Sequence, residues 1–230
     1  MKFGIIGAMQ EEIELLVKSM SNVSVSSHAD MKFYSGKSNE KEVAIVKCGV
    51  GKVNAAVCAQ ILINNFNVNS IIFTGVAGAV DKVLEVGDVV ISSDSVQYDV
   101  DASALGFDPG QICFTDLKYF KADENLVNDV LKASKKLKIK CVKGRVLTGD
   151  RFITDSKELE KLKETFGGIC IEMEGAAIGH VCSINKVPFV IIRSISDKAN
   201  HSASIDFEKF LKKASLVSSS IVHEILKNEP

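Results

Sequence analysis

Residues 168–184 read GICIEMEGAAIGHVCSI and contain the transition that decides the fold of this chain. A short apolar run ends at two carboxylates, Glu172 and Glu174, and a segment with helical spacing of apolar residues follows. Strands that alternate with helices in this way build α/β sheets. We therefore expect a strand at 168–173 and a helix at 174–184, with two acidic side chains at their junction.

The same alternation of apolar runs and helix-periodic segments extends over the whole chain. It predicts an α/β fold with a mixed, mainly parallel central sheet flanked by helices. No Pro/Gly/Ser-rich linker or charge block divides the sequence, so residues 1–230 are expected to form a single domain. The expected strands are 2–7, 32–37, 42–48, 70–75, 88–94, 141–148, 168–173 and 188–195. The expected helices are 10–20, 51–65, 123–136, 156–165, 174–184 and 206–227.

Composition narrows the class of protein. With 46% apolar and 25% charged residues, the chain can bury a sizeable core. The 28 basic residues balance 29 acidic ones and gather in no basic segment, so nucleic acid is not an expected partner. No stretch is long enough to span a membrane, and glutamates follow the N-terminus too early for a signal peptide, so we expect a cytoplasmic protein.

The six cysteines lie far apart, mostly within apolar runs. They form no C-x-x-C pair and show no metal-ligand spacing relative to the four histidines. We therefore expect reduced, buried thiols and no metal site.

Polar residues follow several of the expected strands. In open α/β sheets, ligands bind beyond the carboxyl ends of the strands, so these segments are candidate parts of a site. They are GAMQEE (7–12), TGVAGA (74–79), EMEG (172–175) and SISD (194–197).

Three of these segments carry carboxylates, Glu12, Glu174 and Asp197. Each has a simpler explanation, because Glu in a first helical turn complements the helix dipole and Asp is a common N-cap residue. Their coincidence at three separate strand ends favours a functional site. Side-chain alternation would place Glu172 on the same side as Glu174, where it either assists the site or only buffers it.

Other segments leave alternatives open. TGVAGA and GVGK (49–52) match neither G-x-G-x-x-G nor the P-loop, and each by itself indicates a tight strand-to-helix turn. Phe152, in TGDRFI (148–153), either anchors its loop or stacks on a planar base. The segment from Asp99 to Lys121 is apolar without periodicity, which is typical of a lid or a contact surface.

These motifs resemble those of the 5′-methylthioadenosine/S-adenosylhomocysteine nucleosidases, which belong to the nucleoside phosphorylase/hydrolase family and have a single α/β domain. The most specific part is EMEGAAI with RSISD, at this separation and after GAMQEE. The resemblance implies a homodimeric enzyme without cofactor that hydrolyses these two nucleosides, and 5′-deoxyadenosine, to adenine and the free sugar. It covers nearly the whole chain, through GIIGAMQEE, KCGVGKVNAA, TGVAGA, VGDVV, TGDRFI, EMEGAAIGHVC and VPFVIIRSISD.

The resemblance also implies roles for individual residues. Asp197 resembles the acid that protonates adenine at N7, Glu12 the residue that activates water, and Glu174 the carboxylate that binds the ribose hydroxyls. Such groups suit a reaction that builds positive charge on the sugar and negative charge on the leaving base. The resemblance further implies a set of substrate-binding residues. At the base and the sugar these are Phe152 and Ile153 at adenine, Ser196 beside the acid, Met173 beside Glu174, and Arg193 near the water. The others are Ala77 and Gly78 in TGVAGA, and Met9, Val50 and Phe207 around the 5′-alkylthio group.

Three positions depart from the family pattern, Val76 in the glycine-containing loop, Arg151 beside Phe152, and Leu105 in a segment with less aromatic surface than in some relatives. They affect the expected preference for the 5′-substituent and not the reaction.

A purine nucleoside phosphorylase or a futalosine-type hydrolase of the same fold is the alternative, and a non-catalytic nucleoside-binding protein is another. The loop after the first strand offers Gln10, Glu11 and Glu12 but no arginine, so a phosphate dianion would be repelled there. We therefore favour water as the nucleophile.

Overall fold

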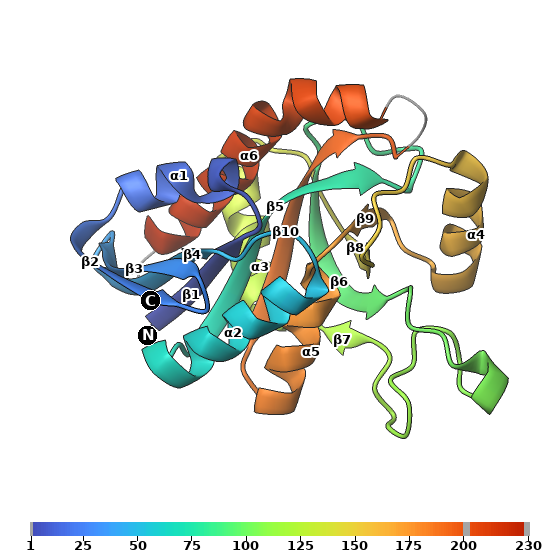
Figure 1. Ribbon diagram of the computed structural model, residues 1–230. Coiled ribbons are helices and arrows are strands. Elements are labelled where there is room, and N and C mark those ends of the chain that lie inside the picture. Colours follow the sequence, from blue (N-terminus) through green and yellow to red (C-terminus); the bar gives the residue numbers. More distant parts are fainter. Residues whose placement is uncertain (1, 200–202, 228–230) are drawn as a thin grey trace.

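The computed structural model describes residues 2–199 and 203–227, in which helices cover both faces of a mixed β-sheet (Figure 1). The α/β class predicted from the sequence is confirmed. The strands are β1 (Lys2–Gly7), β2 (Ser21–His28), β3 (Met31–Ser38), β4 (Lys41–Lys47), β5 (Ser70–Ala79), β6 (Val89–Gln97), β7 (Phe120–Lys121), β8 (Cys141–Thr148), β9 (Cys170–Glu172) and β10 (Phe189–Asp197). The helices are α1 (Gln10–Lys18), α2 (Lys52–Phe66), α3 (Glu124–Lys136), α4 (Ser156–Phe166), α5 (Gly175–Asn185) and α6 (Ala203–Lys227), with a 3₁₀ turn, η1 (Ser103–Leu105).

Part of the sheet closes on itself. The strand order is β10-β6-β8-β9-β5-β1-β4-β3-β2, and β10 also pairs with β5. Strands β5, β10, β6, β8 and β9 therefore form a closed ring, from which β1, β4, β3 and β2 extend as an open sheet. Strands β4, β1, β5 and β10 pair in parallel through the centre of the sheet. The β2-β3-β4 meander is antiparallel, and so are the β5–β9 and β10–β6 pairs of the ring.

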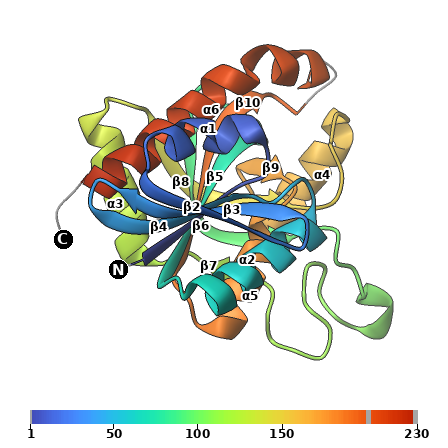
Figure 2. The ribbon, with the colours of Figure 1, turned by 60° about the vertical axis from the view of Figure 1, so that its left-hand side comes forward.

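Two apolar cores lie on opposite faces of the sheet, because successive side chains of a strand point in opposite directions. On β5, Ile71 and Phe73 pack in the core beneath α2 and α5, whereas Ile72 packs in the core with α1, α3 and α6. Figure 2 shows α1 beside α6 on one face and α2 beside α5 on the other. Strands buried on both faces read as continuous apolar runs, which explains why the sequence revealed them.

The structure corrects the sequence prediction in three places. β2, with sequence SNVSVSSH, was missed because every one of its residues is at least partly exposed at the sheet edge, which leaves no buried alternation to detect. β7 was missed because it has only two residues. TGVAGA does not form a turn, since β5 continues through it to Ala79 with all ten residues of the strand buried.

The thiols largely follow the expectation. All six cysteines are free, and four of them, Cys48, Cys58, Cys170 and Cys182, are buried, whereas Cys113 and Cys141 are partly exposed. Within the described ranges, no helix combines the length and apolar character needed to cross a membrane.

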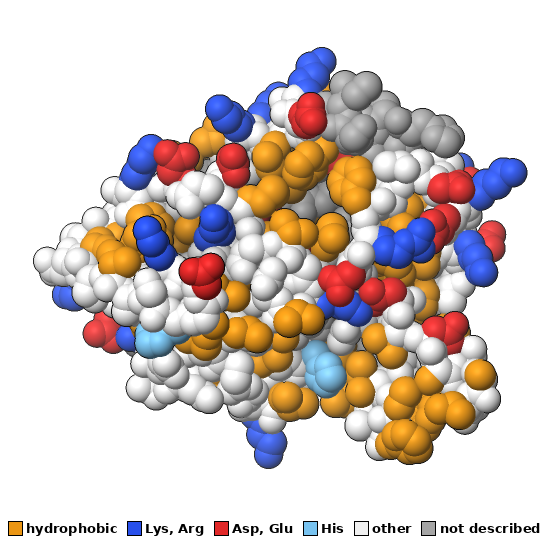
Figure 3. Space-filling view, viewed as in Figure 1, with side chains coloured by type: hydrophobic (Ala, Val, Ile, Leu, Met, Phe, Trp, Pro, Cys, Tyr) orange, Lys and Arg blue, Asp and Glu red, His pale blue; other side chains and the backbone are white. Residues whose placement is uncertain are grey.

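The chain between β6 and α3 extends away from the sheet. Figure 3 shows hydrophobic side chains gathered on this projecting segment, at the lower right of the view. Leu105 and Phe114 are 70% and 85% exposed, and the Phe114 ring contacts Phe107 edge-on at 5.2 Å between centroids. The segment is therefore an exposed apolar surface, and it contains no helix longer than η1.

Candidate active site

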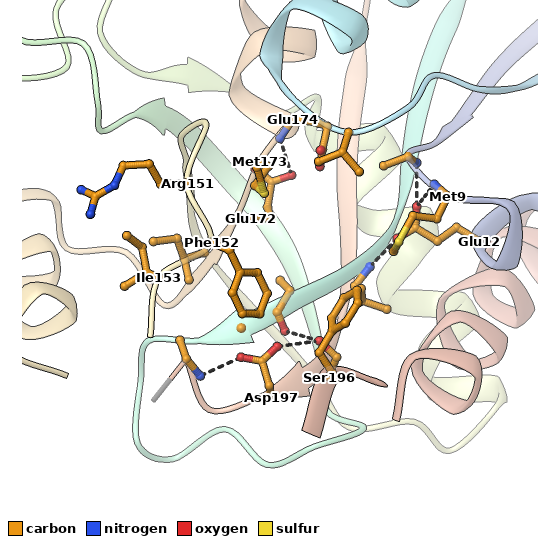
Figure 4. Close-up of a pocket in the computed structure, with 18 of the residues that line it drawn as sticks. Met9, Glu12, Arg151, Phe152, Ile153, Glu172, Met173, Glu174, Ser196 and Asp197 are labelled. Atoms are coloured by element: carbon orange, nitrogen blue, oxygen red, sulfur yellow. Dashed lines mark hydrogen bonds between the residues drawn. The ribbon is translucent and has the colours of Figure 1, made fainter. Parts of the chain in front are cut away.

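A cavity of about 440 Å³ lies where β1, β5, β9 and β10 end (Figure 4). It is lined by every residue of the predicted site except Arg193, namely Glu12, Asp197, Glu174, Met9, Val50, Ala77, Gly78, Phe152, Ile153, Met173, Ser196 and Phe207. The structure thus brings together residues from both ends of the chain. Residues that line it without belonging to the predicted set are Ala8, Val76, Arg151, Ile171, Glu172, Ala199 and Glu208.

Glu12 lies in the first turn of α1, and backbone donors hold its carboxylate. The N–H groups of Ala8 and Met9 donate to Oε2 at 2.6 and 3.0 Å, and the N–H of Val76 on β5 donates to Oε1 at 3.0 Å. Burial raises the pKa of Glu12, although Arg193 and these N–H donors favour its ionised form. The carboxylate is therefore fixed in place and shielded from bulk water.

Arg193 lies behind the cavity among three carboxylates. Its Nη2 atom donates to Glu172 Oε2 at 2.5 Å and lies 3.5 Å from Glu174 Oε2, while Nη1 lies 3.9 Å from Glu12 Oε1. The guanidinium also stacks on Phe73, 3.7 Å from the ring centroid. Arg193 is 1% exposed, so these carboxylates supply the compensation that a buried cation requires.

Glycine at position 75 makes this packing possible. A Cβ atom on Gly75 would lie 2.1 Å from Arg193 Nη1 and 2.3 Å from Glu12 Oε1. Real Cβ atoms do not approach other atoms so closely, so a side chain here would push apart the Glu12–Arg193 arrangement.

Glu172 lines the cavity, although the sequence analysis left it outside the main set of site residues. Its carboxylate accepts hydrogen bonds from the Thr148 hydroxyl, from the Gly175 N–H at 2.8 Å and from the Glu174 N–H at 3.2 Å, besides Arg193. It thus fixes both the cation and the start of α5. The sequence feature that could have identified Glu172 is the pair of carboxylates two residues apart at a strand end.

Glu174 is held by one backbone donor. The Gly51 N–H donates to its Oε1 at 2.8 Å, and the side chain faces the cavity above Met173 (Figure 4). Burial, followed by the neighbouring charge of Glu172, raises the pKa of Glu174 to about 8. The free protein therefore holds a proton at Glu174 over much of the neutral range.

Asp197 ends β10 and is 2% exposed. The Ser196 hydroxyl donates to its Oδ2 at 2.8 Å and the Ala199 N–H donates to its Oδ1 at 2.8 Å. Burial raises the pKa of Asp197. Gly78 permits this position, because a Cβ there would lie 2.9 Å from Asp197 Oδ1. The result is a carboxyl group that keeps its proton to a higher pH than an ordinary aspartate.

Aromatic rings form one wall. Phe152 is 50% exposed, extends into the cavity in Figure 4, and contacts Phe207 edge-on with centroids 5.8 Å apart. Ile153, by contrast, is buried in a small core that includes Ala199. The wall therefore offers a ring face to a planar ligand.

The three positions that depart from the family pattern, Val76, Arg151 and Leu105, lie in different parts of the structure. Val76 lines the cavity and holds Glu12 through its backbone. The Arg151 guanidinium points away from the cavity in Figure 4 and pairs with Glu158, Nη2 to Oε2 3.0 Å. Leu105 does not line the described cavity. The charge of Arg151 is therefore directed away from the cavity.

Comparison with known proteins identifies the family of this chain. The family model of the phosphorylase superfamily matches residues 2–227. A 5′-methylthioadenosine/S-adenosylhomocysteine nucleosidase from Staphylococcus haemolyticus is 43% identical over 97% of this chain and 98% of its own length. The crystal structure of such a nucleosidase from Neisseria meningitidis, in complex with methylthio-immucillin-A, is 37% identical with a TM-score of 0.95, covering 98% of both chains. The futalosine hydrolase of Helicobacter pylori is 30% identical with a TM-score of 0.94, covering 98% of this chain and 97% of that one.

The raised pKa of Glu174 predicts how stability depends on pH. A carboxyl group with a higher pKa in the folded state contributes stability that is fully present below the unfolded pKa of 4.5 and is lost as pH rises to about 8. Glu174→Gln does not titrate, so the variant should gain stability relative to the parent by roughly 1.4 kcal/mol per pH unit within this window. Urea unfolding from pH 5 to 9 measures the difference.

The exposed Glu42, changed to Gln, is the control for the loss of one carboxylate. A Glu174→Gln difference that stays constant from pH 5 to 8 would contradict the proposed protonation of Glu174.

Proposed function

The chain belongs to the phosphorylase superfamily and, within it, to the 5′-methylthioadenosine/S-adenosylhomocysteine nucleosidases, and we propose that its cavity hydrolyses these two nucleosides. It is an N-glycosyl hydrolase that releases adenine and the free thioribose sugar, and 5′-deoxyadenosine is a further expected substrate. The observation that carries the proposal is the arrangement of Glu12, Glu174 and Asp197, delivered by three separate strand ends, around one cavity.

Asp197 is proposed as the acid for the leaving base. As the C1′–N9 bond breaks, its electron pair passes to adenine, and protonation at N7 neutralises the departing base. The raised pKa of Asp197 favours the protonated form that this step requires. After the transfer, the Ser196 hydroxyl and the Ala199 N–H stabilise the new carboxylate, because both donate to it.

Glu174 and Met173 are proposed to bind the ribose. The Glu174 carboxyl has one oxygen on the Gly51 N–H and the other near Arg193, so it is fixed toward the cavity. Hydrogen bonds from ribose hydroxyls would favour its ionised form, and the negative charge would stabilise the positive charge that develops on the sugar.

Glu12 is proposed to orient the attacking water and to accept its proton. Its carboxylate is fixed by three backbone N–H groups, so a water on it would have a defined position. Water then forms the new bond to C1′, and the free sugar results. Arg193 lies close enough to favour the ionised carboxylate.

Two walls are proposed to bind the ends of the substrate. Phe152 would stack on adenine, with the Ile153 backbone at the base edge. At the other end, the apolar side chains of Met9, Val50 and Phe207 suit an uncharged 5′-alkylthio group.

Charge in the cavity supports hydrolysis over phosphorolysis. Arg151 is the cation among the described lining residues, and its guanidinium pairs with Glu158 outside the cavity. Arg193 behind the cavity is surrounded by three carboxylates. A phosphate dianion would therefore meet Glu12 without an unpaired cation. A futalosine-type hydrolase stays the alternative, supported by the structural likeness at 30% identity.

Substitution of the acid tests the first role. Asp197→Asn keeps the shape of the side chain but removes the transferable proton, so turnover of methylthioadenosine should fall by about 10²–10⁴-fold. Adenine release measures turnover, and thermal unfolding checks that the variant folds. A folded variant with half of the parent's turnover would show that the proton comes from another group.

Substitution of Glu12 tests the nucleophile. Glu12→Gln can still orient water but cannot accept its proton, so most activity should be lost. With the parent enzyme, added phosphate should leave free 5-methylthioribose as the sugar product. Chromatography of the products decides the point, since 5-methylthioribose-1-phosphate as the main product would assign the chain to the phosphorylases.

We further propose a homodimer formed through the segment between β6 and α3. The exposed Leu105 and Phe114 support this, because large apolar patches usually mark interaction surfaces. Val53 on α2 is a further exposed apolar side chain. Light scattering should give the mass of a dimer, and Phe114→Asp should weaken it. A monomer with full activity would contradict the proposal.

The proposal extends to the domain organisation, the location of the enzyme and the use of its sugar product. Residues 1–230 form a single domain, which is supported by the family model that spans residues 2–227. We also propose that the enzyme acts in the cytoplasm. Its sugar product, 5-methylthioribose, retains the thiomethyl group and is suited to methionine salvage.

A further inference from the structure

The N-terminus of α2 lacks a cap of its own. Its N-cap residue is Gly51, with φ of 100°, and therefore provides no side-chain oxygen for the first free N–H groups of the helix. Glycine is required at this φ, and the conformation directs the Gly51 N–H to Glu174 Oε1 at 2.8 Å. The residue that orients Glu174 thus leaves the helix end without a local acceptor.

Asp150, from the loop after β8, supplies the missing acceptor. The Lys52 N–H donates to Asp150 Oδ1 at 2.8 Å, across 98 residues of sequence. A Cβ on Gly51 would lie 3.2 Å from the same oxygen, so glycine also leaves room for this approach. Asp150 therefore performs for α2 the function that an Asp or Ser at the N-cap performs in other helices.

Asp99, from the loop after β6, holds Asp150 in turn. The Asp150 N–H donates to Asp99 Oδ2 at 2.9 Å, and Lys52 Nζ donates to Asp99 Oδ1 at 2.6 Å. Lys52, Asp99 and Asp150 thus form a closed cluster that ties together three loops. The side chains of Lys52 and Asp99 are only 17% and 22% exposed, so solvent screens their ion pair less than a free surface pair.

Two of the three loops form walls of the cavity. Val50 and the Gly51 N–H belong to the loop before α2, and Phe152 and Ile153 follow Asp150 by two and three residues. The cluster is therefore placed to fix the ribose side and the base side of the cavity with respect to each other.

We propose that Asp150 is a positioning residue for substrate binding. Through Lys52 it holds the Gly51 N–H against Glu174, and through Asp99 its own backbone fixes the wall that carries Phe152. The inference rests on the proposed function and extends it to a residue that does not line the cavity. Asp197 and Glu12 are held by other donors, so loss of the cluster should weaken binding more than chemistry.

Three variants test the role. Asp150→Ala removes the acceptor and should raise KM for methylthioadenosine about tenfold, as expected when binding must order a loosened loop, with kcat within about threefold of the parent. Asp150→Asn keeps an oxygen acceptor and should restore KM nearly to the parent value. Asp99→Ala releases Lys52 and the Asp150 backbone and should also raise KM. This variant tests the role even if Asp150→Ala folds poorly.

Asp123→Ala is the matched control. Asp123 caps α3 by accepting from the N–H groups of Asn125 and Leu126, both at 3.0 Å, so its loss also removes one helix cap. It should lower the melting temperature without changing KM.

The results of these experiments distinguish the positioning role of Asp150 from the proposed nucleosidase function. Folded Asp150→Ala and Asp99→Ala variants with the parent's KM, or an equal rise of KM in Asp123→Ala, would overturn the positioning role. A parent enzyme that releases no adenine from methylthioadenosine would instead contradict the proposed function.

Discussion

The buried guanidinium of Arg193 is the constraint on which the site depends. A fully buried charge is strongly unfavourable unless opposite charges and hydrogen bonds compensate it. Here three carboxylates surround it, and Phe73 covers its face. The reverse also holds, because Glu12, Glu172 and Glu174 would repel one another without the cation. The site is therefore one electrostatic unit, in which removal of the Arg193 cation would leave buried carboxylates without a compensating charge.

Strand β5 sets the geometry of this unit. Through the Val76 N–H it holds Glu12, and at Gly78, two residues further, it leaves room for Asp197. Two residues of extended chain span about 7 Å, so one strand sets the spacing between the two groups that we propose as base and acid. The pairing of β10 with both β5 and β6 closes the ring and brings Asp197 to this position. Strands β5 and β10 thus position the proposed base and acid, whereas loops carry Val50 and Phe152 of the cavity wall.

The distribution of charge explains why a member of the phosphorylase superfamily can be a hydrolase. The backbone N–H groups at the start of α1 and on β5, which could have bound an external anion, are occupied by the carboxylate of Glu12. The nearby cation is shared among internal carboxylates. A neutral nucleophile fits such a site better than a dianion does.

The sequence by itself determined the α/β class, most of the elements and the three carboxylates at strand ends. It could do so because a strand buried on both faces must be apolar throughout, and a polar residue at its end then stands out. Only the tertiary structure decided the closed ring, the edge strand β2, the continuation of β5 through TGVAGA, the part played by Glu172 and the capping of α2 by Asp150. The physical reason is that periodicity reports the burial of a segment but not its partner. A carboxylate that compensates a cation 21 residues away, or an aspartate that caps a helix 98 residues away, is chosen by packing of the whole chain.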